Sequence, residues 1–136
     1  MIVPLYASGL GLLFVYLSLS TIKLRRKHRV ATGDAGVKDL QKLIRAHSNF
    51  AEYTPLSLML LFFVEVYGGY PKVVVHALCL TLSIGRSIHA YGVSQVKEVF
   101  KYREYGMAMT FISLSSACIL LFLKGFFLGG VEMVPL

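Results

Sequence analysis

The chain has 136 residues, of which 56% are hydrophobic and only 15% are charged. Ordinary soluble domains are about 45–50% apolar and about 25% charged, so the composition excludes a soluble globule, and the length allows one domain over residues 1–136. The net charge of +7 does not favour nucleic-acid binding, because the basic residues cluster beside an apolar segment, as at a membrane edge. Cys79 and Cys118 lie in apolar runs and therefore predict neither a disulfide nor a metal site.

The first and last apolar segments predict membrane-spanning helices. Residues 1–22 and 105–123 carry no charged side chain, and each run is close to the ~20 residues that cross a bilayer core. A signal peptide is the alternative for the first run, but its positive charges would precede the apolar residues, whereas here they follow them. We therefore predict retained helices at about residues 2–24 and 103–125.

The middle of the chain predicts a helical hairpin. The uncharged runs 53–64 and 73–85 are too short to span a bilayer, but the longer segments 44–67 and 72–93, which include their polar neighbours, reach about 33–36 Å as helices. Gly68, Gly69 and Pro71 form a strong signal for one helix to stop and the next to start. We predict helices at about residues 41–67 and 72–93, with loops at 23–40, including a turn at 33–36, and at 94–102. The predicted fold class is an all-α integral membrane bundle of four transmembrane helices.

Basic residues are concentrated in the first and third loops and their edges. These residues are Lys23, Arg25, Arg26, Lys27, Arg29, Lys38, Lys42, Lys97, Lys101 and Arg103. On the opposite side only Lys72 and Lys124 are basic. Lysine and arginine favour the cytosolic side, so we predict cytosolic loops one and three and both termini outside the cytosol. The compact loops favour a bacterial inner membrane.

Polar residues at the start of the second predicted helix form one stripe. At 100° per residue, its members are Arg45, Asn49, Glu52 and Tyr53. A charged helix end that snorkels to water accounts for Arg45. Glu52 lies about two turns deeper on a short side chain, and an acid at that depth is costly without a partner. The stripe is therefore a candidate binding site.

A second polar cluster comes from the last two predicted helices. Arg86 and His89 share a face near the end of the third helix, Tyr91 follows them, and Arg103 begins the fourth. The connectivity brings these helix ends and the start of the second helix to one membrane face. The structural alternative is a buried ion pair between Arg86 and Glu52 that holds the bundle together.

The residue types in these clusters suit a small, mostly anionic ligand that carries one cationic group. Guanidinium groups hold carboxylates, and a carboxylate such as that of Glu52 binds an ammonium group. The sequence contains no glycine-rich phosphate loop, no cysteine and histidine spacing typical of a metal site, and no Ser/His/Asp set.

Residues 45–55 have an arginine, an asparagine four positions later, then Glu-Tyr and a proline. This pattern resembles the second-helix signature of the MAPEG family, the membrane-associated proteins in eicosanoid and glutathione metabolism. Residues 33–36, 85–92 and 103–107 also resemble that family, and look most like its bacterial inner-membrane branch. The resemblance covers nearly the whole chain. It implies four helices per subunit, a homotrimer, and glutathione bound between subunits near the cytosolic face.

The resemblance also implies roles for single residues. Arg45, Asn49, Glu52 and Tyr53 would hold the backbone of glutathione. Arg103 would match the arginine that stabilises the glutathione thiolate in catalytic relatives.

Arg86 and His89 would line the ligand site from the third helix, and a basic residue at the end of the first helix, Arg25 or Arg26, would reach the ligand of a neighbouring subunit. Several catalytic relatives have a tyrosine one turn after the position of His89. Here that position is Val93, and the nearby tyrosine is Tyr91.

These expectations lead to a first hypothesis, an integral membrane glutathione-dependent transferase or peroxidase that acts on hydrophobic electrophiles or lipid hydroperoxides. The alternative is a non-enzymatic membrane protein of the same fold that binds a lipid or a partner. A channel or transporter subunit is disfavoured, because the outer halves of the predicted helices are apolar.

Overall fold

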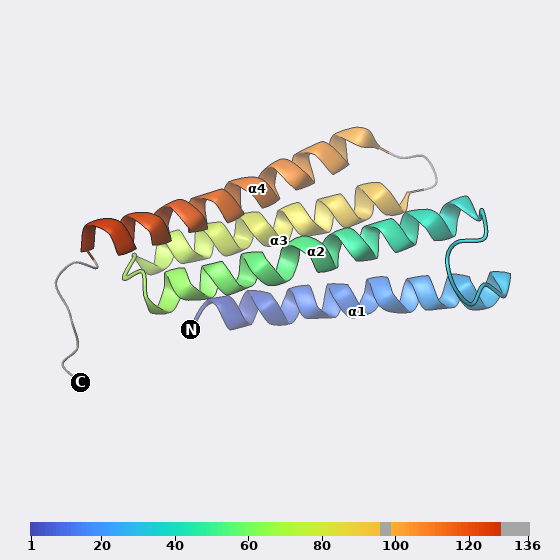
Figure 1. The fold of residues 1–136 in the computed structure, drawn as a ribbon, viewed down its shortest axis with the longest axis horizontal. Coiled ribbons are helices and arrows are strands. Elements are labelled where there is room, and N and C mark those ends of the chain that lie inside the picture. The colour runs from blue at the N-terminus through green and yellow to red at the C-terminus, as the bar shows by residue number, and fades with distance from the viewer. Residues whose placement is uncertain (96–98, 129–136) are drawn as a thin grey trace.

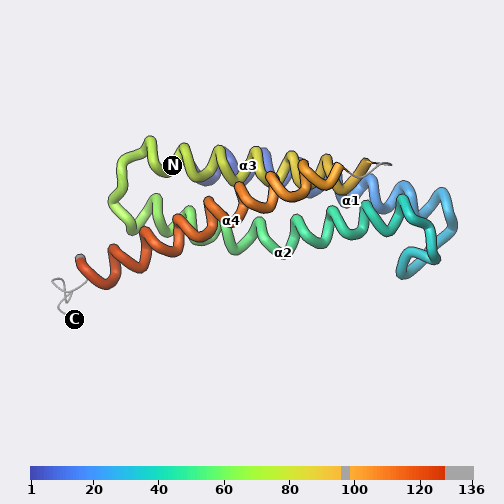
Figure 2. Tube along the Cα trace, turned by 90° about the horizontal axis from the view of Figure 1, so that it is seen from above, coloured from blue at the N-terminus to red at the C-terminus, as the bar shows by residue number. Residues whose placement is uncertain are grey.

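Four long helices make up the described part of the molecule. The computed structural model describes residues 1–95 and 99–128, in which the helices are α1 (Val3–His28), α2 (Lys38–Val66), α3 (Lys72–Ser94) and α4 (Phe100–Leu123). A π-helical turn, η1 (Lys124–Leu128), continues α4. The helices lie alongside one another with alternating direction (Figure 1), and α4 runs obliquely to α2 in the view from above (Figure 2).

Three of the helices have the length and composition of membrane spans. They are α1, α3 and the helix formed by α4 with η1. α2 is long enough but carries charges along its length, including Glu52 at its middle. The all-α prediction is thus confirmed for the described residues. Three of the four helices are apolar enough to cross a membrane, and α2 is not.

The basic residues after the first apolar run belong to α1 and not to a loop. The prediction ends the first helix at about residue 24, whereas α1 continues to His28. Lysine and arginine are good helix formers, and cations are favourable in the last turn, where free carbonyl groups carry partial negative charge. α1 ends at Arg29, which adopts the left-handed conformation with φ +54°. α2 and α4 begin at Lys38 and Phe100, each about one turn before the predicted start.

Two turns connect the first three helices. Between α1 and α2, the Asp34 carboxylate accepts a hydrogen bond from the Gly36 N–H, and the Asp34 carbonyl accepts one from the Val37 N–H, both at 2.9 Å. This is the predicted turn at residues 33–36. Between α2 and α3, Gly69 adopts a φ of +68°, which a side chain would strain, and Pro71 caps the start of α3. The third connection falls partly on residues 96–98, which lie outside the described residues.

Glycines bring the backbones of α3 and α4 into close contact. A Cβ atom on Gly106 would lie 2.7 Å from the Gly85 carbonyl oxygen and 2.7 Å from His89, and one on Gly92 would lie 2.8 Å from the Cβ of Tyr102. No side chain fits at these positions without displacing the facing helix. α3 packs more extensively against α4 than against any other helix. This contact fixes the position of the polar end of α3 along the axis of α4.

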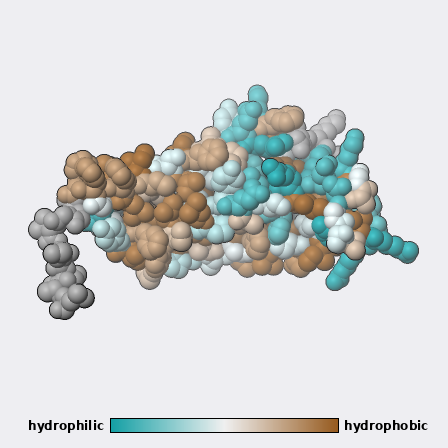
Figure 3. All heavy atoms as spheres, viewed as in Figure 1, coloured by the Kyte–Doolittle hydropathy of each residue, from teal (hydrophilic) through white to brown (hydrophobic). Residues whose placement is uncertain are grey.

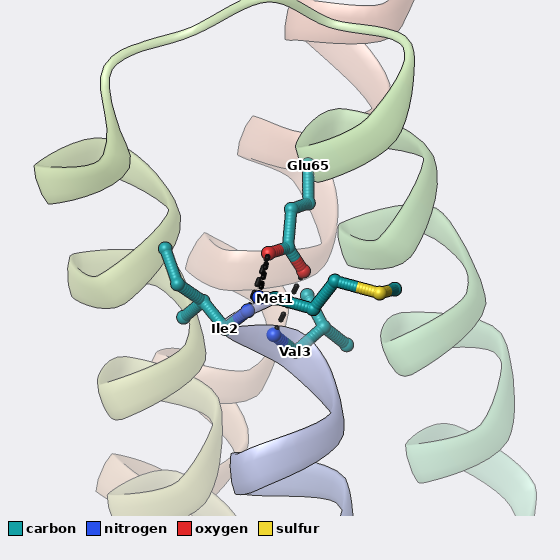
Figure 4. Close-up of polar contacts among 4 residues, drawn as sticks. All are labelled: Met1, Ile2, Val3 and Glu65. Atoms are coloured by element: carbon teal, nitrogen blue, oxygen red, sulfur yellow. Dashed lines mark hydrogen bonds and ion pairs between the residues drawn. The ribbon is translucent and has the colours of Figure 1, made fainter.

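A carboxylate from α2 holds the beginning of α1. Glu65 accepts hydrogen bonds from the backbone N–H groups of Ile2 and Val3, the latter at 2.9 Å, and the Met1 amino group lies 3.9 Å away (Figure 4). The capping position of α1 is Ile2, which has no side-chain acceptor, so Glu65 supplies the acceptor that a helix start requires. α1 packs against α2 and α3, and within the described residues it makes no contact with α4.

Candidate functional site

A fully buried arginine lies between α2, α3 and α4. Arg86, on α3, donates a hydrogen bond from Nη2 to the Asn49 side-chain oxygen at 2.7 Å and from Nη1 to the Met107 sulfur at 3.6 Å. Its guanidinium carbon lies 5.4 Å from the ring centre of Phe50 and 5.9 Å from that of Tyr53. Aromatic faces attract a guanidinium, so α2 supplies three of the four groups around the charge.

The charge of Arg86 is held by neutral groups. In the described part of the chain no carboxylate forms an ion pair with it, and its Nε atom has no hydrogen-bond partner. Burying a cation without an anionic partner costs several kcal/mol, roughly. The arrangement is therefore suited to an anion supplied from outside this subunit.

In the described residues no ion pair joins Arg86 to Glu52, although the Glu52 carboxylate still exerts a Coulombic attraction on the guanidinium. Asn49 and Glu52 lie on one stripe of α2, but Asn49 faces α3 whereas Glu52 is exposed at the edge of the helix. The described residues therefore do not form the buried ion pair of the structural alternative. Glu52 is exposed, so its carboxylate is accessible to a ligand or to another subunit.

A hollow of about 460 Å³ opens where α2 and α4 begin and α3 ends. Its basic lining residues are Lys38, Lys42, Arg45 and Arg103, and its other lining residues include Ser48 and Val93. Lys42 donates a hydrogen bond to the Gln95 carbonyl at 3.2 Å and so joins α2 to the end of α3. Ligand sites commonly measure about 300–1,000 Å³. The predicted convergence of three helix ends is confirmed, and hydrophilic side chains gather at this end of the bundle (Figure 3).

A second hollow of about 300 Å³ lies on the α4 side of the same level. It is lined by His89, Phe100, Arg103, Glu104 and Met107. His89 is only 4% exposed, and its Nδ1 atom has no hydrogen-bond partner. Arg103 lines both hollows, with its guanidinium 5.7 Å from the Phe100 ring centre. A ligand in either hollow would therefore meet Arg103.

A model of the MAPEG family matches residues 3–123 of the chain, which include all four helices and both hollows. The chain belongs to the MAPEG family. The inner membrane protein YecN of Escherichia coli K12 is 37% identical over 114 residues, which are 84% of this chain and 85% of that protein. YecN from the E. coli strain CFT073 matches to the same extent. This MAPEG member is an integral membrane protein.

Like Glu52, the predicted site residues Tyr91 and Arg26 line neither of these hollows of the subunit. Tyr91 is exposed, and its ring lies 5.9 Å from that of Tyr102 on the outer side of α3 and α4. Arg26 is exposed at the end of α1, whereas Arg25 is half-buried and lines the groove between α1 and α2. The helical period places neighbours about 100° apart, so adjacent residues face different surroundings. Val93, where several catalytic relatives have a tyrosine, is the α3 residue that lines the larger hollow.

The structure adds residues that the sequence analysis missed. Phe50 and Met107 contact the guanidinium of Arg86, and Lys38, Lys42 and Ser48 line the larger hollow. Phe50 precedes Tyr53 by three residues, so helical spacing alone predicts that the two rings share a face. The contact of Met107 depends on the height of α4 against α3, which local sequence does not specify.

Proposed function

We propose that this protein is a glutathione-dependent transferase or peroxidase that acts on hydrophobic electrophiles or lipid hydroperoxides. The observation that carries the proposal is the cationic hollow at the joint ends of α2, α3 and α4, in a protein of the MAPEG family. Glutathione carries two carboxylates, one ammonium group and one thiol. Arginine and lysine side chains suit the carboxylates, and an exposed carboxylate such as that of Glu52 suits the ammonium group.

In this proposal Arg45 and Arg103 have different tasks. Arg45 lines only the larger hollow and would hold a glutathione carboxylate in every state of the reaction. Arg103 lies where the two hollows meet and would stabilise the thiolate, because a nearby cation favours the ionised thiol. The bilayer would supply the apolar substrate, and the thiolate would attack its electrophilic atom and displace the leaving group. With a lipid hydroperoxide the thiolate would attack the terminal oxygen and break the O–O bond, so that the lipid alcohol leaves, and a second glutathione would convert the resulting sulfenic acid to the disulfide and water.

A homotrimer completes the proposed site. Glu52 is the middle residue of α2, about 21 Å from either end at 1.5 Å per residue, and it is exposed in the single subunit. A charged side chain at the bilayer centre costs about 2.5–3.5 kcal/mol on insertion scales unless it is covered. Packing α2 against its copies would cover Glu52, with α2 as the fourth span. The basic ends would then face the cytosol of a bacterial inner membrane, with both termini outside it.

Glutathione binding tests the proposal directly. Calorimetric titration of detergent-purified protein is expected to show saturable binding that Arg45→Ala weakens. Lys27→Ala, which removes an exposed cation outside both hollows, is the matched control and should bind as the wild type does. No binding up to millimolar glutathione would overturn the proposal.

A non-enzymatic binding protein is the second candidate. Val93 presents methyl groups to the larger hollow, where several catalytic relatives have a hydroxyl-bearing tyrosine. Binding of glutathione without conjugation of a generic electrophile would favour this candidate over the enzyme.

A further inference from the structure

The two hollows that share Arg103 differ in charge. The described lining residues of the larger hollow include four cations and no carboxylate. The smaller hollow has one cation, Arg103, and one acid, Glu104, together with His89, Phe100 and Met107. Within the part of the chain that the structure describes, Glu104 is therefore the one carboxylate that lines either hollow.

The smaller hollow is suited to an apolar molecule. Phe100, at the first position of α4, is 65% exposed, and most of the surface of this hollow is apolar. Its volume of about 300 Å³ is at the lower end of the range for ligand sites. The hollow is thus large enough for the reacting part of a lipid whose other parts stay in the bilayer.

Bound glutathione leaves the charge of Glu104 without compensation. In the proposed function glutathione occupies the larger hollow, and its thiolate lies at Arg103, where the two hollows meet. The thiolate then balances the positive charge of Arg103. Glu104 is exposed, and no ion pair among the described residues involves it, so its negative charge acts on the molecule that enters the smaller hollow.

The basic surroundings of this hollow give such an acid a task. Clustered lysine and arginine side chains beside a membrane attract anions in general, including the carboxylates of free fatty acids. A carboxylate at the substrate hollow disfavours these anions there, because like charges repel each other. Discrimination between similar ligands commonly depends on a repulsive group of this kind.

We propose that the smaller hollow selects uncharged electrophiles, in particular esterified lipid hydroperoxides, and that Glu104 excludes free fatty-acid hydroperoxides. This inference rests on the proposed function and names the substrate class of that site. The thiolate reacts with both kinds of hydroperoxide in the same way, so the selection acts on the entry of the substrate and not on the breakage of the O–O bond.

Peroxidase kinetics with a matched pair of substrates test the inference. Linoleic acid hydroperoxide and its methyl ester have the same chain and the same O–O bond, and they differ by one negative charge. In a neutral detergent, wild-type protein is expected to use the ester with a kcat/KM about tenfold above that for the acid.

Glu104→Gln keeps the size of the side chain and removes its charge, so the ratio of kcat/KM for ester to acid should fall about tenfold. Asp39→Asn is the matched control and should keep the wild-type ratio. Asp39 is an exposed acid in the first turn of α2 that lines neither hollow.

Ionic strength gives a second measurement that needs no variant. Raising the salt concentration from about 0.1 M to about 1 M shortens the Debye length from about 10 Å to about 3 Å, so it screens the repulsion between Glu104 and a substrate carboxylate. The preference of the wild type for the ester should therefore decrease with salt, while the ratio for Glu104→Gln should stay constant.

Three results would overturn the inference. An unchanged ratio in Glu104→Gln, with glutathione binding intact, would show that Glu104 does not select the substrate. A wild-type ratio that is independent of salt would show the same, and this test holds even if Glu104→Gln does not fold. In both cases the proposed function would stand. If wild-type protein binds glutathione but reduces neither hydroperoxide, this inference and the proposed peroxidase activity are both wrong.

Discussion

At the scale of single residues, the most informative feature is a buried cation whose direct contacts, within the residues that the structure describes, are all with neutral groups. Arg86 has an amide oxygen, a thioether sulfur and two aromatic rings around it, and one of its nitrogen atoms is unpartnered. Hydrogen bonds to charged groups contribute about 1.5–3 kcal/mol, so the amide of Asn49 is the strongest single restraint on Arg86.

Asn49→Ala should lower the free energy of unfolding by about 1.5–3 kcal/mol, because it removes the oxygen acceptor of a buried guanidinium. Denaturation of the detergent-purified protein measures the change. Ser87→Ala, at an exposed position one residue from Arg86, should change stability by less than about 0.5 kcal/mol. Equal effects of the two substitutions would contradict the role given to Asn49.

Arg103→Ala should separate catalysis from binding. An interaction made mainly with the reacting charge lowers turnover and leaves binding nearly intact, and loss of one such donor costs about 10²–10³ in rate. Conjugation of a generic electrophile and the thiolate absorbance of bound glutathione are the measurements. Lys101→Ala, at an exposed position near the start of α4, should retain both signals. Full activity in Arg103→Ala would contradict the proposed role of Arg103 in stabilising the thiolate and would favour the binding-protein candidate.

At the scale of helices, the contact between α3 and α4 has no room for side chains at its glycines. Gly106 and Gly85 pack against each other's backbone, and Gly92 packs against the start of α4. This close approach fixes how far α4 is displaced along α3. It therefore places Met107 beside Arg86 and Arg103 beside the end of α3. The alignment of the site therefore depends on residues that do not line it.

Gly106→Ala should destabilise the protein by about 1–3 kcal/mol, because the added methyl group would lie 2.7 Å from backbone atoms of α3. Gly9→Ala is the control, since its Cβ would meet nothing within 4 Å and alanine is the better helix former. Thermal unfolding in detergent should show a lower midpoint for Gly106→Ala and an unchanged or higher midpoint for Gly9→Ala.

Glu65→Gln should loosen the start of α1. A carboxylate oxygen is replaced by an amide NH₂, so one backbone N–H of Ile2 or Val3 loses its acceptor, and the favourable charge at the helix start is lost. Faster hydrogen exchange at the first turn of α1 is the expected result. Glu104→Gln, at an exposed position on α4, should leave that exchange unchanged. Unchanged exchange in Glu65→Gln would contradict the capping role.

The sequence was sufficient to predict the helices and the meeting of their polar ends, because apolar length, glycine turns and connectivity determine both. It was not sufficient to predict that Arg25 is half-buried while Arg26 and Tyr91 are exposed, since one position along a helix turns a side chain by 100°. The role of Glu65 was also missed. Its partners are backbone amides 62 and 63 residues away, and backbone groups leave no residue pattern in the sequence.

At the scale of the whole molecule, the single subunit has one exposed acid on a largely apolar edge of α2. Glu52 is exposed at the middle of α2, while the neighbouring exposed positions Leu56 and Met59 are apolar. A carboxylate on an apolar helix surface in a membrane is most stable when another protein surface covers it and supplies a polar partner.

We predict a homotrimer with α2 innermost, as the resemblance to the family implies. Native mass spectrometry in several mild detergents should show three copies, and Glu52→Lys should shift the distribution toward monomers by introducing repulsion with Arg45 and its copies. Glu104→Lys makes the same charge change on α4 and should leave the trimer intact. Only monomers for the wild type in every detergent would contradict the prediction.

The limited contacts of α1 have a consequence for how the chain enters the membrane. α1 is synthesised before α2 and α3, yet among the described residues it packs only on these two helices, and the acceptor for its first turn is Glu65 near the end of α2. Until translation passes that point, the backbone amides at its beginning have no protein partner. A ribosome-stalled chain that ends at residue 55 should therefore leave the start of α1 accessible to water-soluble labels, and a chain that also contains α2 and α3 should protect it. In this bundle α1 therefore docks only after α2 and α3, which follow it in the chain, have entered the membrane.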